Sequence, residues 1–412
     1  MKIDAKWLDV VQDDAPELSA TACELAIEVG ARDVCRLYDK GVAQDHPVLP
    51  AYPLAEGLAM NWWWLMAGRS GALGLRSFRE GFAVPDVIFT VDGHSVVVEA
   101  KRYQYDNPPV SFVESAKESL SIQKLAHALR TFITDVVNRL DDKTIPDTVL
   151  AERWADIRRS QSDPEEMEFC EAAGAMGIDP YLCSDADIQL ITDSGRSFNQ
   201  SQLAELLSSR DPSTIRVDLD WVRHQEQAGT LVPMPDLAAL GRDVRGAVAK
   251  GGHREAWGLG YATAMEIRRQ LDLAPNEPLA GVGRLVEIFG GVRPPIGEGH
   301  GRNIRAAVRV QEGQPAIVVG AFKDERSRAF ALARAVGDYL VFGREGRSPV
   351  MSTHSYQQAV GRAFAAEVLA PGERVRTMRD DGWALEDIAD EFQVSDRVIT
   401  HQLENLERLH AV

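Results

Sequence analysis

The chain has 412 residues, of which 45% are hydrophobic and 26% are charged, the balance of a folded globular protein. The formal net charge of −17 argues against a protein that coats nucleic acid non-specifically. Four cysteines without a Cys-x-x-Cys spacing are too few for a disulfide scaffold, and neither a signal peptide nor an apolar run of membrane-spanning length is present, so we expect a cytoplasmic protein. At roughly 150 residues per domain, the length predicts two or three domains.

The first predicted block, residues 1–145, combines helices with a strand pair and is expected to form an α/β module. The apolar segment after Pro53, which includes three consecutive tryptophans, predicts a helix. Two β-branched runs within 87–100 flank an Asp-Gly pair and predict a β-hairpin. From 112 to 140 the apolar positions recur every three or four residues, which predicts a long amphipathic helix.

The second and third blocks are residues 146–250 and 251–412. The second is polar and helical, carries no recognisable catalytic motif, and is interpreted as a helical connector or interaction surface. The third alternates helices with one strand pair. Its predicted elements are helices 260–273 and 281–289, strands 306–310 and 315–319, helices 325–342 and 354–369, and a short helical tail.

Part of the third block resembles a family of zinc peptidases. The segments RAFALARAVGDYL (328–340) and AFAAEVLAP (363–371), together with the strand 315–319 and the helix 260–273, resemble ImmA/IrrE-type peptidases. The resemblance covers about 255–412 and implies the fold of that family. Its chemistry needs His-Glu-x-x-His on a helix, because two histidines one turn apart bind zinc and the glutamate acts as base.

The residues at those three positions are Arg334, Ala335 and Asp338. An arginine and an alanine cannot replace a neutral imidazole and a general base. Arg334 and Asp338 are one helical turn apart, so we expect them to form an ion pair on the vacated site.

The further carboxylate ligand of that family is also missing. It should fall just before the segment 363–371, where the sequence has Gln357, Gln358 and Val360. Because all the ligand positions fail together, the resemblance predicts a pseudo-peptidase that keeps the fold, binds no zinc and does not hydrolyse proteins.

The tail has a helix-turn-helix pattern, with a second helix that starts after Ser395. If this helix contacts DNA, Arg397 and Gln402 are the residues expected to do so. A single arginine between acidic residues is a poor phosphate-binding set, and the resembling peptidases carry a similar tail as part of their fold.

The predicted hairpin carries a second set of chemically informative residues. Pro85-Asp86 and Glu99-Ala100-Lys101 match the PD-(D/E)xK pattern of magnesium-dependent nucleases. Side chains alternate along a strand, so Glu99 and Lys101 share one face. Asp86 and Glu99, with Glu56 from the preceding helix as a third carboxylate, would hold Mg²⁺, and Lys101 would orient the attacking water. A Glu-x-Lys pair on a strand is also common as a simple solvated ion pair, so both interpretations stay open.

Together these patterns predict an α+β, predominantly helical fold: an N-terminal α/β module, a helical middle segment and an ImmA/IrrE-like pseudo-peptidase domain with a helix-turn-helix-like tail. Two functions follow. The first is a non-catalytic sensor or regulatory protein of bacterial stress response, mobile-element control or phage defence, which binds a protein segment or a small-molecule trigger. The second is a Mg²⁺-dependent nuclease whose C-terminal domain senses a trigger and whose substrate is nucleic acid. Neither predicts membrane association or zinc, and the oligomeric state stays open.

Overall fold

The fold is described from a computed structural model of the whole chain. The described residues are 1–9, 15–69, 71–91, 95–106, 109–195, 198, 200–207, 212–228, 231–251, 255–274, 277–279, 281–291, 303–322, 324–353 and 355–410. Helices hold 56% and antiparallel sheets 21% of the chain, so the predicted α+β, predominantly helical class is confirmed at that level. Within the described ranges, every helix is too short or too polar to serve as a membrane span.

The chain forms two compact units, unit 1 (Met1–Ile191) and unit 2 (Thr192–Val412). The helices of the expected connector 146–250 are divided between them. The helices α5 (Val149–Ser162) and α6 (Pro164–Met176) belong to unit 1. The helices α8 (Gln200–Leu207), α9 (Pro212–Gln227) and α10 (Pro235–Val248) belong to unit 2.

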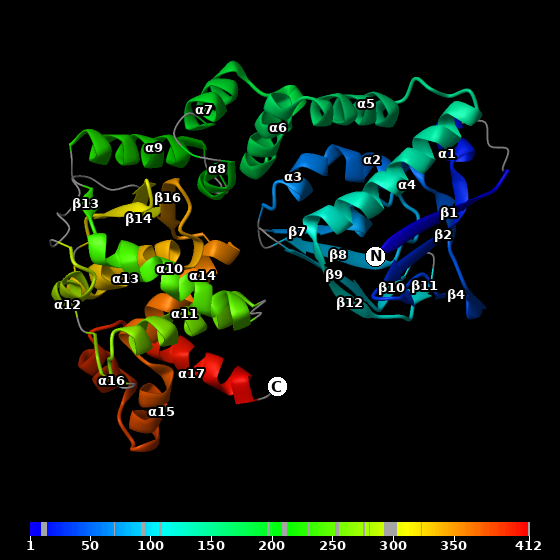
Figure 1. Cartoon of the computed structure of the whole chain (residues 1–412). Coiled ribbons are helices and arrows are strands. Elements are labelled where there is room, and N and C mark those ends of the chain that lie inside the picture. Colours follow the sequence, from blue (N-terminus) through cyan, green and yellow to red (C-terminus); the bar gives the residue numbers. More distant parts are fainter. Residues whose placement is uncertain are drawn as a thin grey trace. The chain divides into compact units, whose positions relative to one another are not determined.

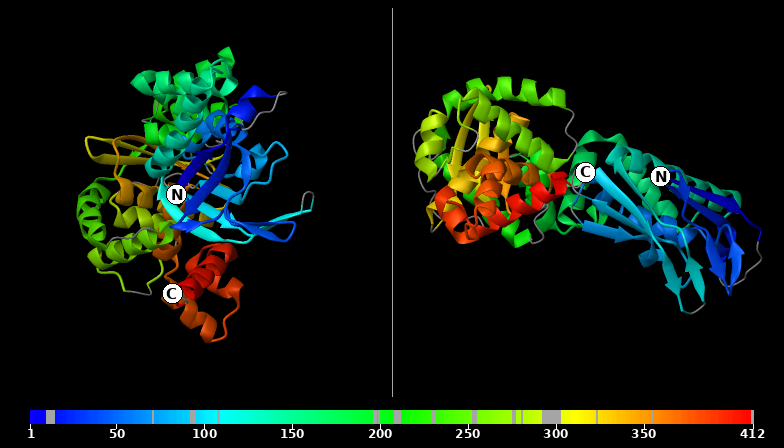
Figure 2. Two further views of the ribbon diagram at one scale, coloured as in Figure 1. Left: turned by 90° about the vertical axis from the view of Figure 1, so that its right-hand side faces the viewer. Right: turned by 90° about the horizontal axis from the view of Figure 1, so that it is seen from below.

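Unit 1 consists of three small antiparallel sheets with helices gathered on one side of the strands (Figures 1 and 2). Its remaining elements are β1 (Lys2–Trp7), α1 (Pro16–Ala20), β2 (Ala22–Val29), β3 (Arg32–Asp33), β4 (Leu37–Asp39), β5 (Val42–Gln44), β6 (Val48–Pro50), α2 (Tyr52–Met60), α3 (Trp62–Met66), β7 (Gly71–Gly74), η1 (Leu75–Phe78), β8 (Asp86–Val91), β9 (Ser95–Lys101), β10 (Tyr103–Tyr105), β11 (Val110–Phe112), β12 (Ala116–Ser121), α4 (Ile122–Asp142) and η2 (Pro180–Leu182). The strand orders are β12-β9-β8-β7, β10-β11-β4-β5 and β1-β2-β3, with β6 paired to β2.

The predicted hairpin is present as β8 and β9, although its Asp-Gly turn lies outside the described residues. One face of these strands is apolar and buried, with Phe89 and Val98 fully covered. This face shares a hydrophobic core with α2 and α4, including Leu58 and Phe132. The burial of one face leaves the alternate side chains of β8 and β9 on the opposite face of the sheet.

The long helix predicted from 112 to 140 begins later than expected, at Ile122. Residues 116–121 instead form β12, which pairs antiparallel with β9. The prediction was wrong here because Ala, Lys, Glu and Leu favour helices in isolation, while cross-strand pairing decides the conformation. Ser121 marks the change, since its side chain accepts a hydrogen bond from the Lys124 amide at 3.3 Å.

We expect Ser121→Ala to lower the free energy of unfolding by about 1 kcal/mol, because α4 then loses its N-terminal cap. Ser119→Ala, at an exposed position of the same strand, is the matched control and should be nearly silent. Urea unfolding followed by hydrogen exchange in peptides of α4 measures both. Equal effects of the two substitutions would contradict the assigned helix start.

Unit 2 contains one four-stranded antiparallel sheet, in the order β13-β15-β14-β16, and most of the helices. Its elements are α8 (Gln200–Leu207), α9 (Pro212–Gln227), β13 (Val232–Pro233), α10 (Pro235–Val248), η3 (Ala249–Gly251), α11 (Ala256–Gln270), α12 (Gly281–Ile288), β14 (Ile304–Gln311), β15 (Gln314–Val319), α13 (Glu325–Phe342), β16 (Gly346–Met351), α14 (Tyr356–Leu369), α15 (Gly372–Asp380), α16 (Leu385–Phe392) and α17 (Asp396–His410). The predicted strand pair and the two helices after it are confirmed. The helix α7 (Asp185–Gly195) spans the division between the units.

The helix α13 lies at the centre of unit 2, against the sheet and beside α14 (Figure 1). It begins after Asp324, whose carboxylate accepts a hydrogen bond from the Ser327 amide at 2.7 Å, and ends at Gly343 with φ +52°. Leu332, Val336 and nearly every residue around them are buried. Polar side chains on such a helix must find partners inside the protein, because water does not reach them.

Candidate functional site

The structure brings together the residues that occupy the expected zinc-peptidase positions. Arg334 and Asp338 on α13 and Gln357 and Gln358 on α14 are all buried, and they form two hydrogen-bonded pairs, Arg334 with Gln358 and Asp338 with Gln357. We call these four residues, with Glu205 described below, the buried polar cluster. Val360, the other residue considered near the missing ligand position, is fully buried in the apolar core.

Arg334 is 6% exposed and bonds to two neighbouring elements. Its Nη2 donates to the Met351 carbonyl oxygen at the end of β16 (2.5 Å) and to Gln358 Oε1 (2.6 Å). Gln358 is itself fixed, because its Oε1 also accepts from the Met351 amide and its Nε2 donates to the Pro349 carbonyl. Arg334 therefore links α13, α14 and β16 where the resemblance expects the first zinc ligand.

Asp338 lies where the resemblance expects the second histidine. Its Oδ1 accepts a hydrogen bond from Gln357 Nε2 at 2.6 Å, and Gln357 Nε2 also lies 3.0 Å from the Ser348 hydroxyl on β16. The expected ion pair between Arg334 and Asp338 is not formed, so that prediction was wrong. The i, i+4 rule describes exposed helix faces, whereas on this buried helix each side chain bonds to a different adjacent element.

Ala335, where the resemblance expects the catalytic glutamate, is fully buried within the apolar core of unit 2. It has no group that can accept or deliver a proton. The site as described therefore has no base at the position where the resembling family carries one.

Glu205 of α8 belongs to the same cluster and was not anticipated from the sequence. It is 8% exposed, and its Oε1 accepts hydrogen bonds from Thr353 Oγ1 (2.8 Å) and Ser355 Oγ (2.7 Å). Both hydroxyls lie between β16 and α14. The one sequence signal is an acidic residue inside the leucine-rich segment LAELL (203–207), because a carboxylate among buried leucines needs an internal partner.

Burial dominates the electrostatics of this cluster. It lowers the pKa of Arg334 to about 9, with further lowering by the charges of Arg362 and Arg305 and opposition from Glu205 and Asp338. Burial raises the pKa of Asp338 against the hydrogen bonds from Ser348 and Gln357. It likewise raises the pKa of Glu205 against the hydroxyls that bond to it.

A pH dependence of stability follows from Asp338. Its pKa is higher in the folded than in the unfolded state, so the folded state binds more protons between the two values, and the free energy of unfolding falls as pH rises through that interval. The charged groups that act on it are Arg334, Arg344 and Glu205. We expect the free energy of unfolding of Asp338→Asn, relative to that of the wild type, to rise by up to about 1.4 kcal/mol per pH unit as the pH increases inside that interval.

Urea unfolding at about pH 5 and about pH 8 measures this difference. Asp387→Asn, which removes an exposed carboxylate of α16, is the control. A difference between Asp338→Asn and the wild type that stays constant with pH would show that Asp338 titrates as it does in the unfolded chain.

The two helices of the predicted helix-turn-helix are α16 and α17. Of the two residues expected to contact DNA, one is buried and the other is exposed. Gln402 is fully buried, and its Nε2 donates to Glu367 Oε2 (2.9 Å) and to the Ala370 carbonyl (2.7 Å), while its Oε1 accepts from the Tyr261 hydroxyl. It fixes the tail to α11 and α14 and cannot contact DNA in this structure, so the tail is integrated into unit 2.

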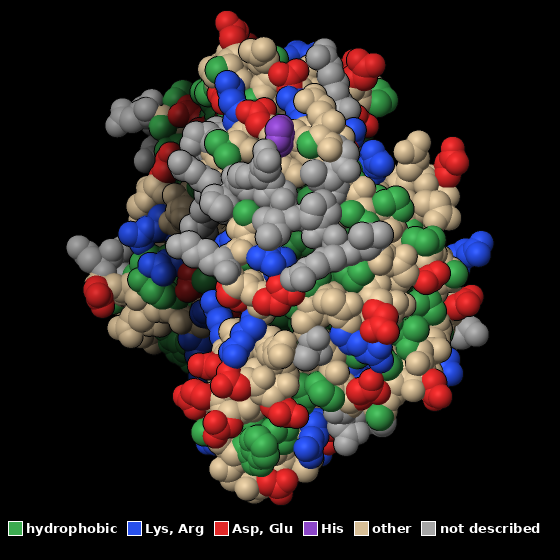
Figure 3. All heavy atoms as spheres, turned by 90° about the vertical axis from the view of Figure 1, so that its left-hand side faces the viewer, with side chains coloured by type: hydrophobic (Ala, Val, Ile, Leu, Met, Phe, Trp, Pro, Cys, Tyr) green, Lys and Arg blue, Asp and Glu red, His purple; other side chains and the backbone are tan. Residues whose placement is uncertain are grey.

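Arg397 is exposed at the start of α17, and its Nε lies 3.4 Å from His401 Nε2. The preceding helix, α16, presents acidic side chains to solvent, among them Glu386, Asp387 and Asp390. Figure 3 shows acidic side chains prominent over the lower part of the unit 2 face, at the height of α15 and α16 in Figure 1. Like charges at this surface repel a phosphate backbone.

The candidate nuclease residues of unit 1 are only partly brought together. In the β8–β9 register Asp86 is opposite Lys101, and Glu99 is opposite Ile88, so Asp86, Glu99 and Lys101 share one face of adjacent strands. Lys101 Nζ lies 3.3 Å from Glu99 Oε2, and Arg76 Nη1 lies 3.6 Å from Asp86 Oδ1.

Glu56 interacts with the Tyr52 hydroxyl on its own helix, α2, which packs against α4 and α5. Across the described residues no three His, Cys, Asp or Glu side chains are grouped closely enough to hold a metal ion. The expected set of Glu56, Asp86 and Glu99 is therefore not assembled as a metal site in this structure.

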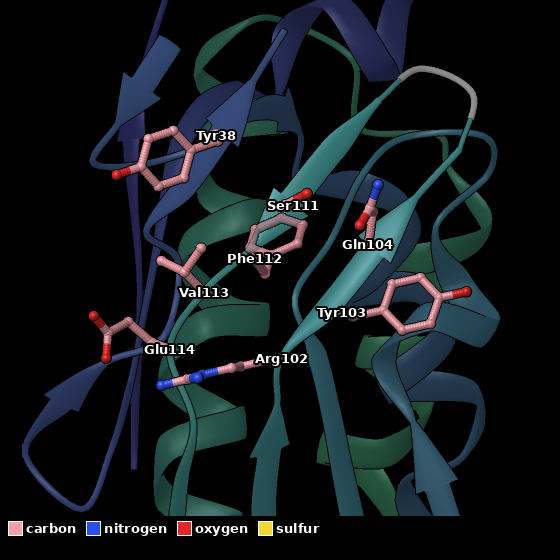
Figure 4. A pocket seen from close by; sticks show the side chains of 8 residues that line it. All are labelled: Tyr38, Arg102, Tyr103, Gln104, Ser111, Phe112, Val113 and Glu114. Atoms are coloured by element: carbon pink, nitrogen blue, oxygen red, sulfur yellow. The ribbon is translucent and has the colours of Figure 1, made fainter. Parts of the chain in front are cut away.

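Unit 1 has two open hollows of about 550 Å³ each, of which one borders this strand face. One is lined by Glu99, Lys101, Arg102 and Lys117 together with small side chains. The other lies on the small sheet around Tyr38, and Figure 4 shows Arg102 directed toward Glu114 at one end while Tyr103 turns away. The first hollow has three basic side chains and one carboxylate and is therefore net positive, whereas the second has one arginine and one glutamate.

No protein-family model, no curated protein and no solved structure matches this chain. What the chain does is therefore inferred from its own residues.

Proposed function

We propose that unit 2 is a non-catalytic, ImmA/IrrE-like pseudo-peptidase domain and that the chain is a sensor or regulatory protein. The resemblance places this role in bacterial stress response, mobile-element control or phage defence. The chain recognises a protein segment or a small-molecule trigger without cutting it, and it uses no zinc.

One observation carries this proposal: the residues at the three expected ligand positions meet in space. Arg334 and Asp338 are one turn apart on α13, and Gln357 and Gln358 reach them from α14. Zinc peptidases need this meeting of two helices, because the metal takes its ligands from both. Hydrogen bonds between amide, guanidinium and carboxyl groups stabilise the same junction here without a metal.

Restoring the ligands tests the proposal. We expect Arg334→His/Asp338→His/Gln357→Glu to bind one Zn²⁺ per chain with a dissociation constant of about 1 μM or tighter, because two imidazoles one turn apart and a carboxylate from α14 form a three-ligand site. Ala335 is left unchanged, since the resemblance gives that position a catalytic rather than a ligand role. Zinc binding is measured by calorimetry and by metal analysis after gel filtration.

The matched control, Arg334→Gln/Asp338→Asn/Gln357→Glu, alters the same positions without imidazoles and should bind no zinc. A folded histidine variant that binds no zinc would contradict the assigned relation between α13 and α14. Stoichiometric zinc held by unit 2 of the wild-type protein would contradict the pseudo-peptidase assignment itself.

The nuclease remains a second candidate because one observation favours it: Asp86, Glu99 and Lys101 share a sheet face on adjacent strands. Two carboxylates and a lysine in this relation are the residues that Mg²⁺-dependent phosphodiester cleavage uses. Mg²⁺ would have to displace the Lys101–Glu99 and Arg76–Asp86 pairs, and water would complete its coordination.

Purified protein should be mixed with linear, supercoiled and single-stranded DNA and with RNA, in Mg²⁺ or Mn²⁺. If unit 1 is a nuclease, Glu99→Gln/Lys101→Met should lose at least about 100-fold in cleavage rate. Glu24→Gln/Lys6→Met, which removes an exposed glutamate–lysine pair between two other strands of the same unit, is the control and should cut normally. Wild-type cleavage that survives in the Glu99/Lys101 variant would rule out this site.

A further inference from the structure

We propose that the buried polar cluster of unit 2 is a binding site for an oxyanion, a carboxylate or phosphate group, and that Glu205 of α8 fills this site from within the chain. The proposal rests on the proposed function, because it takes the junction of α13 and α14 as a former active site. It adds the chemical class of the ligand and the segment that the ligand displaces.

The charges around Glu205 favour an anion. Arg334 is close enough to Arg362 and Arg305 for their positive charges to lower its pKa further than burial does, and the charges of Glu205 and Asp338 oppose this lowering. Burial lowers the pKa of Arg362, and the negative charge of Glu205 opposes this lowering. Arg362 Nη1 donates a hydrogen bond to the Thr353 carbonyl oxygen at 2.7 Å. Three guanidinium groups act in this cluster against two carboxylates, Glu205 and Asp338, and the remaining excess of positive charge is costly in a buried site without an anion.

The hydrogen-bond donors have the arrangement that an oxyanion needs. The Thr353 and Ser355 hydroxyls converge on one oxygen of Glu205, at 2.8 and 2.7 Å. Ser355 is also the N-cap of α14, a helix of 14 residues, so the positive end of its dipole adds to the arginines. Any carboxylate or phosphate oxygen placed there would accept the same two bonds.

An unused donor gives independent evidence. Arg334 Nε is buried without a hydrogen-bond partner, although the rest of the side chain is well bonded. A buried donor without an acceptor costs roughly 1–3 kcal/mol, and native proteins rarely tolerate one without a role. A tetrahedral anion has more acceptor oxygens than the carboxylate of Glu205 and would bring them into the cluster in which this donor lies.

The helix that carries Glu205 is short enough to be displaced. It has eight residues and is held by buried Leu203, Leu206 and Leu207. A helix of two turns is unstable by itself, so its position depends on these contacts and on Glu205. A ligand that binds the arginines more strongly than Glu205 does would shift the population toward a form with α8 released.

Chemical rescue tests the proposal in the full-length protein. Glu205→Ala should lower the thermal unfolding temperature of unit 2, and added acetate or inorganic phosphate should restore it saturably, beyond the effect of chloride at matched ionic strength. Rescue by acetate alone indicates a carboxylate ligand, and rescue by phosphate indicates a phosphate-bearing one. The wild type should respond less, because Glu205 already occupies the site.

Two variants serve as controls. Glu205→Ala/Arg362→Met should lose the rescue, because one of the cations is gone. Glu226→Ala removes a carboxylate of the same unit that pairs with Arg347, and should show no saturable anion effect. A folded Glu205→Ala protein that neither anion stabilises beyond chloride would overturn the proposal.

If Glu205→Ala does not fold, Glu205→Gln keeps the shape and removes the charge. Phosphate should then increase hydrogen exchange in residues 200–207, and unchanged exchange would overturn the proposal. The result of the anion experiment can be distinguished from the result of the zinc-binding experiment that tests the proposed function. Rescue in Glu205→Ala together with failure of the zinc-restored variant would leave the anion site standing without its peptidase ancestry, and the reverse pattern would remove the anion site alone.

Discussion

Gly260→Ala should lower the free energy of unfolding of unit 2 by about 3 kcal/mol, because the added methyl group meets the backbone of a neighbouring helix. A Cβ atom at Gly260 would lie 2.6 Å from the Val360 carbonyl oxygen and 2.8 Å from the Phe364 amide nitrogen. Backbone atoms cannot rotate away as a side chain can, so α11 and α14 must separate. Because α14 carries Gln357 and Gln358, the separation should also loosen the buried polar cluster.

Hydrogen exchange as a function of urea, read in peptides of α11 and α14, measures this loss without mixing the two units. The matched control is Gly246→Ala on α10, where an added Cβ meets nothing within 4 Å. This control should stabilise unit 2 by about 0.5–1 kcal/mol through helix propensity. If both substitutions had the same effect, the close crossing of α11 and α14 would be wrong.

The elements that could be predicted from the sequence are those in which local periodicity and burial agree. The strands β8 and β9 alternate buried and exposed residues around a turn signal, and α13 and α14 have long apolar stretches between clear start and stop residues. The strand β12 was missed because its residues prefer helices and only the pairing with β9 holds them extended. Strands of two or three residues, such as β3 and β5, have no period that could be recognised.

The candidate site was predictable in its positions and not in its bonds. The resemblance placed Arg334, Asp338 and the two glutamines near one another, and the structure has them in one cluster. Their partners depend on contacts distant in sequence, such as the bond between Glu205 and Ser355 across 150 positions. A single sequence does not carry that pairing, so the ion pair expected from local spacing was the wrong inference.

Burial also decides whether a polar side chain such as that of Gln402 has a structural role or can contact a ligand. Gln402 was considered a DNA contact because it lies in the second helix of a helix-turn-helix pattern. The amphipathic pattern of α17 does not show that a glutamine faces inward, since glutamine is usually exposed. Its partners Tyr261 and Glu367 lie on α11 and α14, so only the tertiary structure shows that it is part of the core.

The run of three tryptophans in unit 1 leads to the second large expected effect. Trp62 is fully buried and packs edge-on against Trp154 of α5, with ring centroids 5.2 Å apart. Trp62→Ala should therefore cost about 3–5 kcal/mol in the free energy of unfolding of unit 1, since an indole-sized cavity opens between α3 and α5. Hydrogen exchange in peptides of these two helices measures the loss.

Trp62→Phe separates packing from hydrogen bonding at the same position. The indole Nε1 of Trp62 is buried without a hydrogen-bond partner, so replacing the ring by a phenyl group removes an unsatisfied donor along with some volume. The lost volume destabilises unit 1 and the removed donor stabilises it, so Trp62→Phe should lower the free energy of unfolding of unit 1 by less than about 1.5 kcal/mol. An alanine variant that lost no more than the phenylalanine variant would mean that Trp62 is exposed in solution. The run would then be free for a stacking role on a partner rather than serving the core of unit 1.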